Sequence, residues 1–223
     1  IGHYSDNLRS RWGRRHPLMY ASAIPLAITF VMLFNPPRDW SEPALFAYQL
    51  GVVAALRERG VVPAAVVGHS VGEVAAAVTA GALELADGLK IVVTRSRLQA
   101  EQTGQGTMAL ALAAAVEVSP NLVAGVVVAG HNAPRAILIA GTPTGLDASV
   151  RRLESLGVAV LPVRVPIAYH SPQMDPLRPR LETELEDLAP RSGSIPFVST
   201  VTGSEHPGET LDGSYWGRNL CQP

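Results

Sequence analysis

Aromatic residues, charged residues and cysteine are all scarce in this sequence of 223 residues. Aromatics account for 5% and charged residues for 17%, whereas 47% of the residues are hydrophobic, so most of the apolar content is aliphatic. This composition favours layered α/β structure over a β-sandwich. The single cysteine, Cys221, excludes a disulfide framework and fits a reducing compartment. The length allows one domain of ordinary size, with or without a small addition.

A surplus of either charge is also missing. Eighteen basic residues face nineteen acidic ones, which gives a formal net charge of −1. The sequence therefore lacks the basic footprint of a nucleic-acid-binding domain, and we expect no nucleic-acid partner. We also expect no metal site and no bound cofactor.

The first forty residues differ from the rest of the chain. Arginines gather between residues 6 and 15, and an uncharged, largely apolar run follows at 18–34. A helix of that length would extend about 25 Å, close to the hydrocarbon thickness of a bilayer, and the arginines match the positive-inside pattern. The run predicts a hydrophobic helix, either inserted in a membrane or buried in a soluble fold. Pro25 and the absence of a cleavage motif disfavour a secretory signal.

Periodicity beyond a Pro-Pro pair at 36–37 predicts alternating helices and strands. We place the boundary after residue 40. Helices are expected over 44–59, over 71–80, from a cap at Asp87 toward Gly104, and over 146–156. Strands are expected over 64–68, buried on both faces, and over 108–114, 123–129, 136–140 and 158–163. This alternation predicts a layered α/β sheet.

The strongest chemical signal is the sequence GHSVGE at residues 68–73. It is a G-x-S-x-G nucleophile elbow between a predicted strand and a predicted helix. The turn is so tight that we expect bulky side chains at 68 or 72 to collide with it. Ser70 is the predicted nucleophile, and the Val71 backbone N–H is the predicted oxyanion donor. The alternative is that Ser70 merely caps the helix.

A serine hydroxyl needs a base to accept its proton, and we predict that His170 is this base. His170 follows a predicted strand and precedes a proline turn, where a loop can present a side chain to a cleft. The other histidines lie in the N-terminal segment, in loops, or beside the nucleophile with the ring directed away: His3, His16, His131, His206 and His69.

Several segments resemble one known family, the malonyl-CoA:acyl carrier protein acyltransferases, and most closely the acyltransferase domains of type I polyketide synthases. Residues 68–73 resemble its nucleophile motif, and residues 168–172 (AYHSP) its histidine motif. Arg95 stands where the family keeps an arginine that holds the malonyl carboxylate. Residues 215–223 are similar to the stretch that leads into its final strand. The resemblance covers residues 41–223, with the motifs in the expected order.

The resemblance implies a fold as well. It predicts an α/β-hydrolase-like core with a parallel sheet, formed by residues 41–106 and 166–223. A small ferredoxin-like subdomain is expected at 107–165. Residues 1–37 instead resemble a fragment of a sugar:cation symporter of the major facilitator type. A fragment of this size cannot form a transport pathway, so we expect the remainder of the chain to carry the function.

The activity that the resemblance implies is ping-pong acyl transfer. A malonyl group would pass from CoA to Ser70 and then to the phosphopantetheine thiol of an acyl carrier protein, in polyketide or fatty acid synthesis. The expected partners are malonyl-CoA, the carrier protein and neighbouring polyketide synthase domains. The expected location is cytoplasmic, with membrane contact only through the N-terminal helix.

Further residue roles also follow from the resemblance. Arg95 would bind the substrate carboxylate, although by its pattern alone it is a solvated helix residue. A backbone carbonyl near Asn219 would orient His170. The pair Val71 and Tyr169 goes with malonyl rather than methylmalonyl, whereas Ile167 departs from the common patterns.

Two departures from the family pattern keep other functions open. Symporter-like residues occupy the place of an N-terminal Gly-Gln-Gly strand, and the chain stops before the last strand, with Cys221 where an arginine is usual. The sequence GQG at 104–106 follows the nucleophile and is not that motif. The alternatives are a serine hydrolase or thioesterase, and an inactive hybrid fragment. For a hydrolase triad, Asp147 and Asp175 are the candidate acids, and neither has a supporting pattern.

Overall fold

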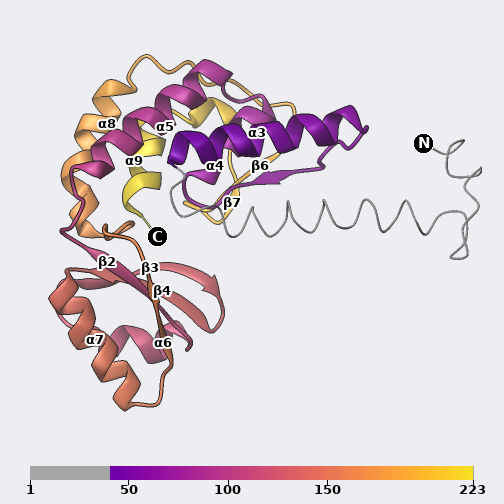
Figure 1. The fold of residues 1–223 in the computed structure, drawn as a ribbon. Coiled ribbons are helices and arrows are strands. Elements are labelled where there is room, and N and C mark those ends of the chain that lie inside the picture. The colour runs from indigo at the N-terminus through magenta and orange to yellow at the C-terminus, as the bar shows by residue number, and fades with distance from the viewer. Residues whose placement is uncertain (1–40, 223) are drawn as a thin grey trace, which may run out of the picture. The chain divides into compact units, whose positions relative to one another are not determined.

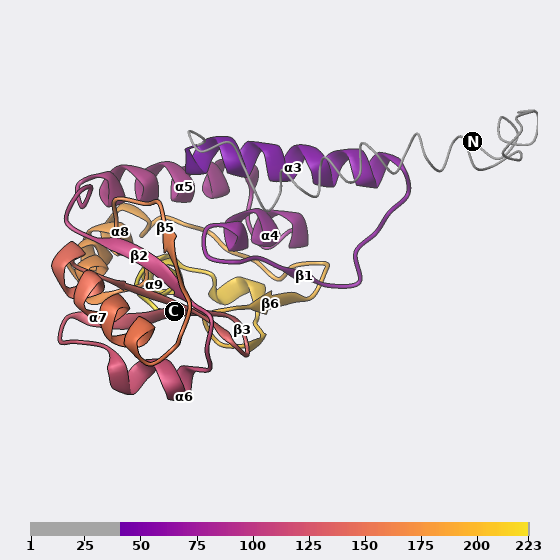
Figure 2. The same cartoon turned by 60° about the horizontal axis from the view of Figure 1, so that its bottom comes forward.

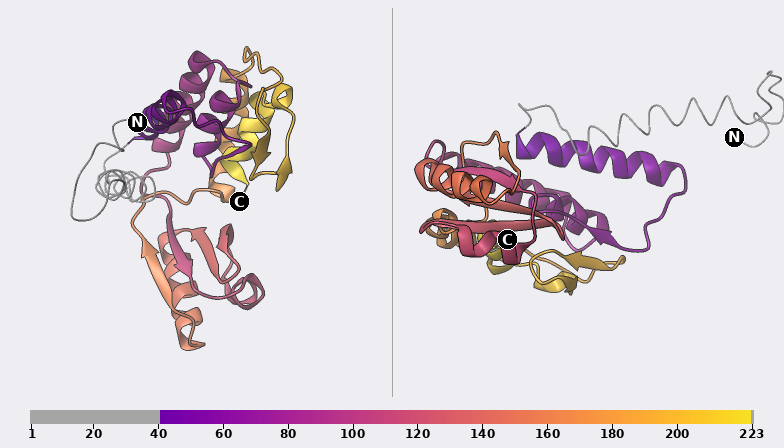
Figure 3. Two further views of the ribbon diagram at one scale, coloured as in Figure 1. Left: turned by 90° about the vertical axis from the view of Figure 1, so that its right-hand side faces the viewer. Right: turned by 90° about the horizontal axis from the view of Figure 1, so that it is seen from below.

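The structure is a computed structural model that describes residues 41–222, in which helices and strands alternate along the chain to form an α/β fold (Figure 1). The hydrophobic helix expected at 18–34 lies outside the described residues. Every helix within residues 41–222 is too short or too polar to span a lipid bilayer. The strands form two separate sheets, each with its own helices (Figure 3).

The first sheet has the strand order β1-β6-β7 and carries most of the helices. β1 (Val66–Val67) runs parallel to β6 (Phe197–Ser199), and β7 (Ser204–Glu205) pairs antiparallel with β6. The associated helices are α3 (Glu42–Glu58), α4 (Gly72–Ala80), α5 (Leu85–Ala100), α8 (Arg178–Glu184) and α9 (Gly213–Cys221), with the 3₁₀ turns η2 (Pro172–Leu177) and η3 (Gly208–Thr210). Helices α3, α4 and α5 contact one another, and α4 also contacts β1 and β6 (Figure 2).

The second sheet has the order β3-β4-β2-β5, with every neighbouring pair antiparallel. Its elements are β2 (Thr107–Ala111), α6 (Ala115–Val118), η1 (Ser119–Asn121), β3 (Val126–Ala133), β4 (Ala136–Gly141), α7 (Pro143–Ser155) and β5 (Val160–Val163). Helix α7 packs against all four strands. Its buried Leu146 and Leu153 join Ile137 and Ile139 of β4 in a separate apolar core.

Local sequence explains several helix ends. The α4 helix stops at Gly81, whose φ of 80° lies in the left-handed region. Glycine adopts this conformation without strain. Thr142 caps α7 by accepting a hydrogen bond from Gly145 N–H, and Pro143 follows it at the first helical position. Asp212 caps α9 by accepting from Tyr215 N–H. These caps fix where the chain enters or leaves the helices.

Two expectations about the elements are wrong, and several further elements had no prediction. The strand expected to be buried on both faces is the two-residue β1 at a sheet edge, where Val67 is 64% exposed. Asp87 does not cap α5, because the helix already begins at Leu85 and the capping position is Glu84. Helices α8 and α9 and strands β6 and β7 had no sequence prediction, since prolines and short apolar spacings obscure their periodicity.

Candidate active site

The turn between β1 and α4 presents Ser70 in a strained backbone conformation. Its φ is 53°, in the left-handed region that serine rarely adopts. A Cβ atom at Gly68 would lie 2.2 Å from the Glu73 backbone nitrogen, so only glycine fits there. A Cβ at Gly72 would find its nearest neighbour, Gln49 Nε2, at 3.5 Å. The expected collision is therefore present at position 68 and absent at position 72.

His170 lies within hydrogen-bond distance of this serine. It follows β5 and precedes η2, and its φ is also 53°. Ser70 Oγ lies 2.8 Å from His170 Nε2, and His170 Nδ1 lies 2.7 Å from the Gln222 carbonyl oxygen. A carbonyl can only accept, so Nδ1 carries the proton that it donates to Gln222. In the neutral ring, Nε2 then has a free lone pair for the Ser70 hydroxyl.

The surroundings keep His170 neutral. Burial and the nearby Arg95 cation lower its pKa to about 4, and the hydrogen bond to Gln222 opposes this only partly. A neutral imidazole at physiological pH is the form that can accept the serine proton. The Ser70 and His170 pair therefore has both the geometry and the protonation state of a nucleophile and its base.

Arg95 is a third member of the site. It lies on α5 and is 1% exposed, so it is not the solvated helix residue that its pattern alone suggests. Its Nη2 donates a hydrogen bond to Ser70 Oγ at 2.9 Å, and its Nε donates to Glu42 Oε1 at 3.3 Å. Its Nη1 donates to the side-chain oxygen of Asn219. A buried cation thus lies directly beside the serine oxygen.

A backbone carbonyl near Asn219 does contact His170, but Asn219 itself has another role. The carbonyl that contacts His170 belongs to Gln222, which follows the end of α9 in an extended conformation. Asn219 lies inside α9, and its Nδ2 donates to Glu73 Oε2 at 2.9 Å and to the Ser70 carbonyl at 3.4 Å. Because that amine faces Glu73, the amide oxygen faces Arg95. Asn219 therefore fixes Arg95 rather than the histidine.

Beneath the elbow, Glu73 is completely buried and fully hydrogen-bonded. Its Oε1 accepts from the Thr200 hydroxyl at 2.6 Å and from the Thr200 backbone N–H, and its Oε2 accepts from the Tyr215 hydroxyl at 2.6 Å. With the bond from Asn219, these contacts join α4, the end of β6 and α9. A buried carboxylate needs this number of donors to offset its lost hydration.

The remaining predicted residues lie around the same turn. Val71 is at the capping position of α4. The next residue, Gly72, donates its backbone N–H to the His69 carbonyl. As a backbone donor at the start of α4, the Val71 N–H has no acceptor within the helix. Ile167 is buried, and Tyr169 packs partly buried against the apolar residues of both sheets.

Sequence reasoning missed Glu42, Glu73 and Gln222. Glu73 belongs to the elbow motif itself, so its position offered a signal, whereas Glu42 and Gln222 had none. The two candidate acids of a triad are not partners of His170: Asp147 pairs with Arg151, and Asp175 lies in η2. The described residues contain no group of three or more His, Cys, Asp or Glu side chains that could hold a metal ion.

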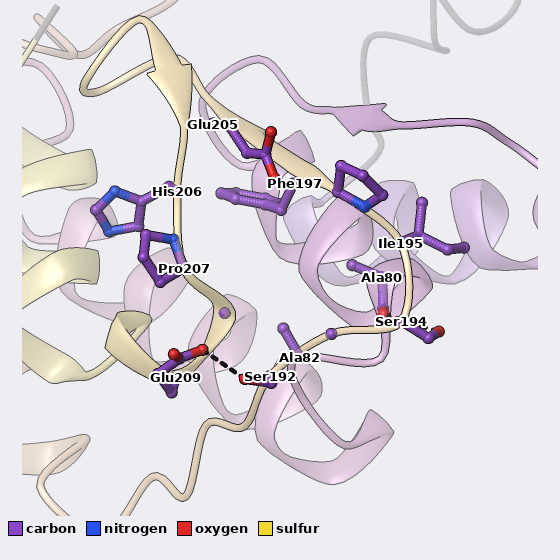
Figure 4. Close-up of a pocket in the computed structure, with 13 residues that line it drawn as sticks. Ala80, Ala82, Ser192, Ser194, Ile195, Phe197, Glu205, His206, Pro207 and Glu209 are labelled. Atoms are coloured by element: carbon purple, nitrogen blue, oxygen red, sulfur yellow. Dashed lines mark hydrogen bonds between the residues drawn. The ribbon is translucent and has the colours of Figure 1, made fainter.

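A cavity of about 620 Å³ lies away from Ser70, between the end of α4 and the segments on either side of β6 and β7. Figure 4 shows its lining, with Phe197, His206 and Pro207 on one side and Ser192 hydrogen-bonded to Glu209 across its lower rim. None of the predicted site residues lines this cavity. It is therefore separate from the serine site.

Comparison with known proteins finds two family matches. A family model described as acyl transferase domain matches residues 38–223, and one described as MFS/sugar transport protein matches residues 1–58. The second match lies mostly outside the described residues.

Polyketide synthases are among the similar sequences. A phenolphthiocerol/phthiocerol polyketide synthase polypeptide of Mycobacterium tuberculosis is 42% identical over 188 residues, which are 83% of this chain and 10% of the relative. The spectinabilin polyketide synthase protein NorA' of Streptomyces orinoci is 40% identical over 195 residues, 85% of this chain and 5% of the relative. The chain thus spans a tenth or less of the length of these curated relatives.

Solved acyltransferase domains are similar in structure. The domain from module 8 of the salinomycin polyketide synthase has a TM-score of 0.79 and 38% identity, covering 81% of this chain and 44% of the other. The domain of phenolphthiocerol/phthiocerol synthase A from Mycobacterium bovis (BCG) has a TM-score of 0.77 and 37% identity, covering 82% and 70%.

Proposed function

The chain belongs to the acyl transferase domain family, and from this membership we propose that it transfers a malonyl group from CoA to an acyl carrier protein. The acceptor is the phosphopantetheine thiol of the carrier, and the acyl group passes through an ester on Ser70. The proposed setting is a type I polyketide synthase, whose neighbouring domains are the further partners; the similar chains are named as polyketide synthases.

The observation that carries this proposal is the distance of 2.9 Å between Arg95 Nη2 and Ser70 Oγ. In a malonyl ester, one CH₂ group separates the ester carbonyl from the free carboxylate. The cation that binds this carboxylate must therefore lie within a few ångströms of the serine oxygen. A buried guanidinium suits a carboxylate because it can donate two parallel hydrogen bonds. A simple esterase has no need for such a cation.

Acylation begins when His170 Nε2 accepts the Ser70 proton and Oγ attacks the thioester carbon. The Val71 N–H at the start of α4 stabilises the negative oxygen of the tetrahedral intermediate. The C–S bond breaks, and the protonated His170 gives its proton to the departing CoA sulfur. The Gln222 carbonyl holds the ring in the required tautomer throughout.

Transfer to the carrier reverses these steps. His170 accepts the proton of the phosphopantetheine thiol, and the sulfur attacks the ester carbonyl on Ser70. The C–O bond breaks, and the proton returns to Ser70 Oγ. Since acyl-CoA and carrier are the two substrates, no separate cofactor takes part.

We further propose that Tyr169 restricts the acyl group to malonyl, together with Val71 and Ile167. Its aromatic ring lies next to His170 in the chain, where it would occupy the space that an α-methyl group needs. A steric clash discriminates more strongly than a missing methyl contact, which alone gives about 10-fold to 200-fold. We expect Tyr169→Ser to admit methylmalonyl-CoA.

The domain boundaries are part of the same proposal. We assign residues 41–106 and 166–223 to an α/β-hydrolase-like core and residues 107–165 to a ferredoxin-like subdomain. The parallel pairing of β1 with β6 supports the first assignment, and the strand order β3-β4-β2-β5 with two crossover segments supports the second. Residues 1–40 are proposed to be a separate, transporter-like segment.

The test is acylation by malonyl-CoA followed by measurement of the intact mass. One malonyl adduct is expected, and Ser70→Ala should abolish it, with a loss of transfer of several orders of magnitude. Adding a holo acyl carrier protein should discharge the ester and acylate the carrier. Release of free malonate without carrier acylation would instead identify a hydrolase, and absence of any adduct an inactive fragment.

A further inference from the structure

Arg95 already has a carboxylate partner within the protein. Glu42, the first residue of α3, accepts the hydrogen bond from Arg95 Nε at 3.3 Å. The side chain of Arg95 is 2% exposed and that of Glu42 is 19% exposed, so water screens this pair little. The proposed function requires the same guanidinium to bind the carboxylate of the acyl group. Two carboxylates would then face one buried cation.

The second oxygen of Glu42 makes this pairing unusual. Its Oε2 is buried and has no hydrogen-bond partner among the described residues. An ionised oxygen in such a position loses its hydration without compensation, whereas a protonated carboxyl group does not. Burial accordingly raises the pKa of Glu42, and the attraction of Arg95 offsets this only in part.

Arg95 and Tyr169 interact electrostatically with Glu42, and the next titratable groups, His170 and Glu73, are connected to it through Arg95. Helix α5 contributes Arg95, and the loop after β5 contributes Tyr169, whose pKa is raised by burial and by the negative charge of Glu42. The same loop carries His170, whose pKa burial and Arg95 lower. Helix α4 contributes Glu73, which is linked to Arg95 through the side-chain amide of Asn219. Arg95 is the one cation in this group.

We propose that Glu42 limits the preference of Arg95 for dicarboxylic acyl groups. The negative charge of Glu42 opposes a second carboxylate, and Glu42 takes up one proton from solvent when a malonyl group binds. The inference rests on the proposed function of Ser70 and Arg95. Above the pKa of Glu42, the empty site holds one cation and one anion. The occupied site holds the cation, the substrate anion and a neutral Glu42, so total charge is conserved by the added proton.

The proposed proton uptake fixes the direction in which malonyl binding depends on pH. Above the pKa of Glu42, malonyl binding must be accompanied by proton uptake, so it weakens as the pH rises. An acetyl group has no carboxylate and requires no proton. The ratio of kcat/KM for malonyl-CoA to that for acetyl-CoA therefore falls with rising pH. Titration of His170 affects both substrates and cancels in this ratio.

The first experiment measures this ratio in the full chain and in Glu42→Gln, from about pH 5.5 to about pH 8.5. The glutamine keeps an oxygen that can accept from Arg95, so the pair geometry is retained. We expect the ratio to rise at least about tenfold at the alkaline end, because like charges in contact cost several kcal/mol, and to lose its pH dependence. Glu58→Gln, at the exposed end of the same helix, should leave the ratio unchanged.

A second experiment separates this inference from the proposed function. Calorimetry of malonyl-CoA binding to Ser70→Ala, in buffers of different ionisation enthalpy, should show proton uptake that disappears when Glu42→Gln is added. Malonylation of Ser70 without proton uptake, or with a ratio that Glu42→Gln leaves unchanged or lowers, would overturn the role of Glu42 alone. A chain that neither binds malonyl-CoA nor forms the ester would overturn both proposals.

Discussion

The two sheets of the described chain differ in what they bury. Next to the first sheet and its helices, the buried polar or charged side chains are Glu73, Thr79, Thr94, Arg95, Gln99, Ser171, Ser199 and Asn219. Within residues 107–163, which form the second sheet, Ser149 is the one such side chain among those described. Ser149 accepts a hydrogen bond from Val123 N–H and so fastens a loop to α7.

The second sheet is stabilised by an apolar core, whereas the region of the first sheet holds the reactive groups. Burying polar groups costs free energy unless every group is paired, so an apolar core is the simpler way to stabilise a sheet. The first region accepts this cost, and its network converges on Ser70 through Arg95, Asn219 and Glu73. It also contains both non-glycine residues with positive φ among those described, Ser70 and His170. Strain and buried polarity therefore coincide at one site.

The largest expected effect comes from removing the buried cation. Arg95→Ala should lower malonyl transfer about 10³-fold, because truncating one member of a buried hydrogen-bonded charge pair costs several kcal/mol. Acetyl transfer should persist, because Ser70 and His170 remain. Arg135→Ala, which removes an arginine with a 67% exposed side chain from the turn between β3 and β4, is the matched control and should change neither rate. Equal loss with both acyl groups would contradict the carboxylate role of Arg95.

A smaller effect on stability is expected at Glu73. Glu73→Ala leaves the donors of Thr200, Tyr215 and Asn219 without an acceptor and should lower the free energy of unfolding by about 3 kcal/mol. Glu154→Ala, at an exposed position of α7, should change it by less than about 0.5 kcal/mol. Urea unfolding followed by circular dichroism measures both. Similar values for the two variants would remove the distinction between the regions.

Two conservative core substitutions sharpen the comparison further. Ile139→Val in the second sheet and Ile91→Val on α5 each remove one buried methylene and should cost about 1 kcal/mol of stability. Ile91 lies one turn before Arg95, so only its variant should alter the ratio of malonyl to acetyl adducts. A ratio altered by Ile139→Val would show that the second sheet also shapes the site.

The smallest effect concerns pH. Since the pKa of His170 in the folded protein is about 4, below its ordinary value of 6.5, the histidine stays neutral down to mildly acidic pH. Its contribution to stability is complete above 6.5 and is lost as the pH falls toward about 4. Acylation by acetyl-CoA should therefore be nearly constant from neutral pH to about pH 5. A half-maximal rate near 6.5 would show that the base is not His170 in this environment.

Local sequence patterns were sufficient for part of this picture. The elbow at 68–73 was readable because a tight turn, its glycine and the following helix are specified within six residues. Glycine is required at position 68 because a Cβ atom there would collide with the Glu73 backbone nitrogen. Helices such as α3 and α4 and the α/β class followed from periodicity and from glycine stops. Interactions between near neighbours determine all of these.

Tertiary structure determined which side chains of the site are hydrogen-bonded to one another. Arg95 meets Glu42 across 53 positions and Asn219 across 124, and His170 meets Gln222 across 52. No periodicity encodes such distances, which is why the carbonyl that orients His170 was located only to the neighbourhood of Asn219 and Glu42 was overlooked. Local motifs identified Ser70 and His170, whereas Arg95 was indicated only by the family resemblance. Only the packing of α3, α5 and α9 around the elbow determined their partners and charge states, because burial and hydrogen bonding depend on distant segments.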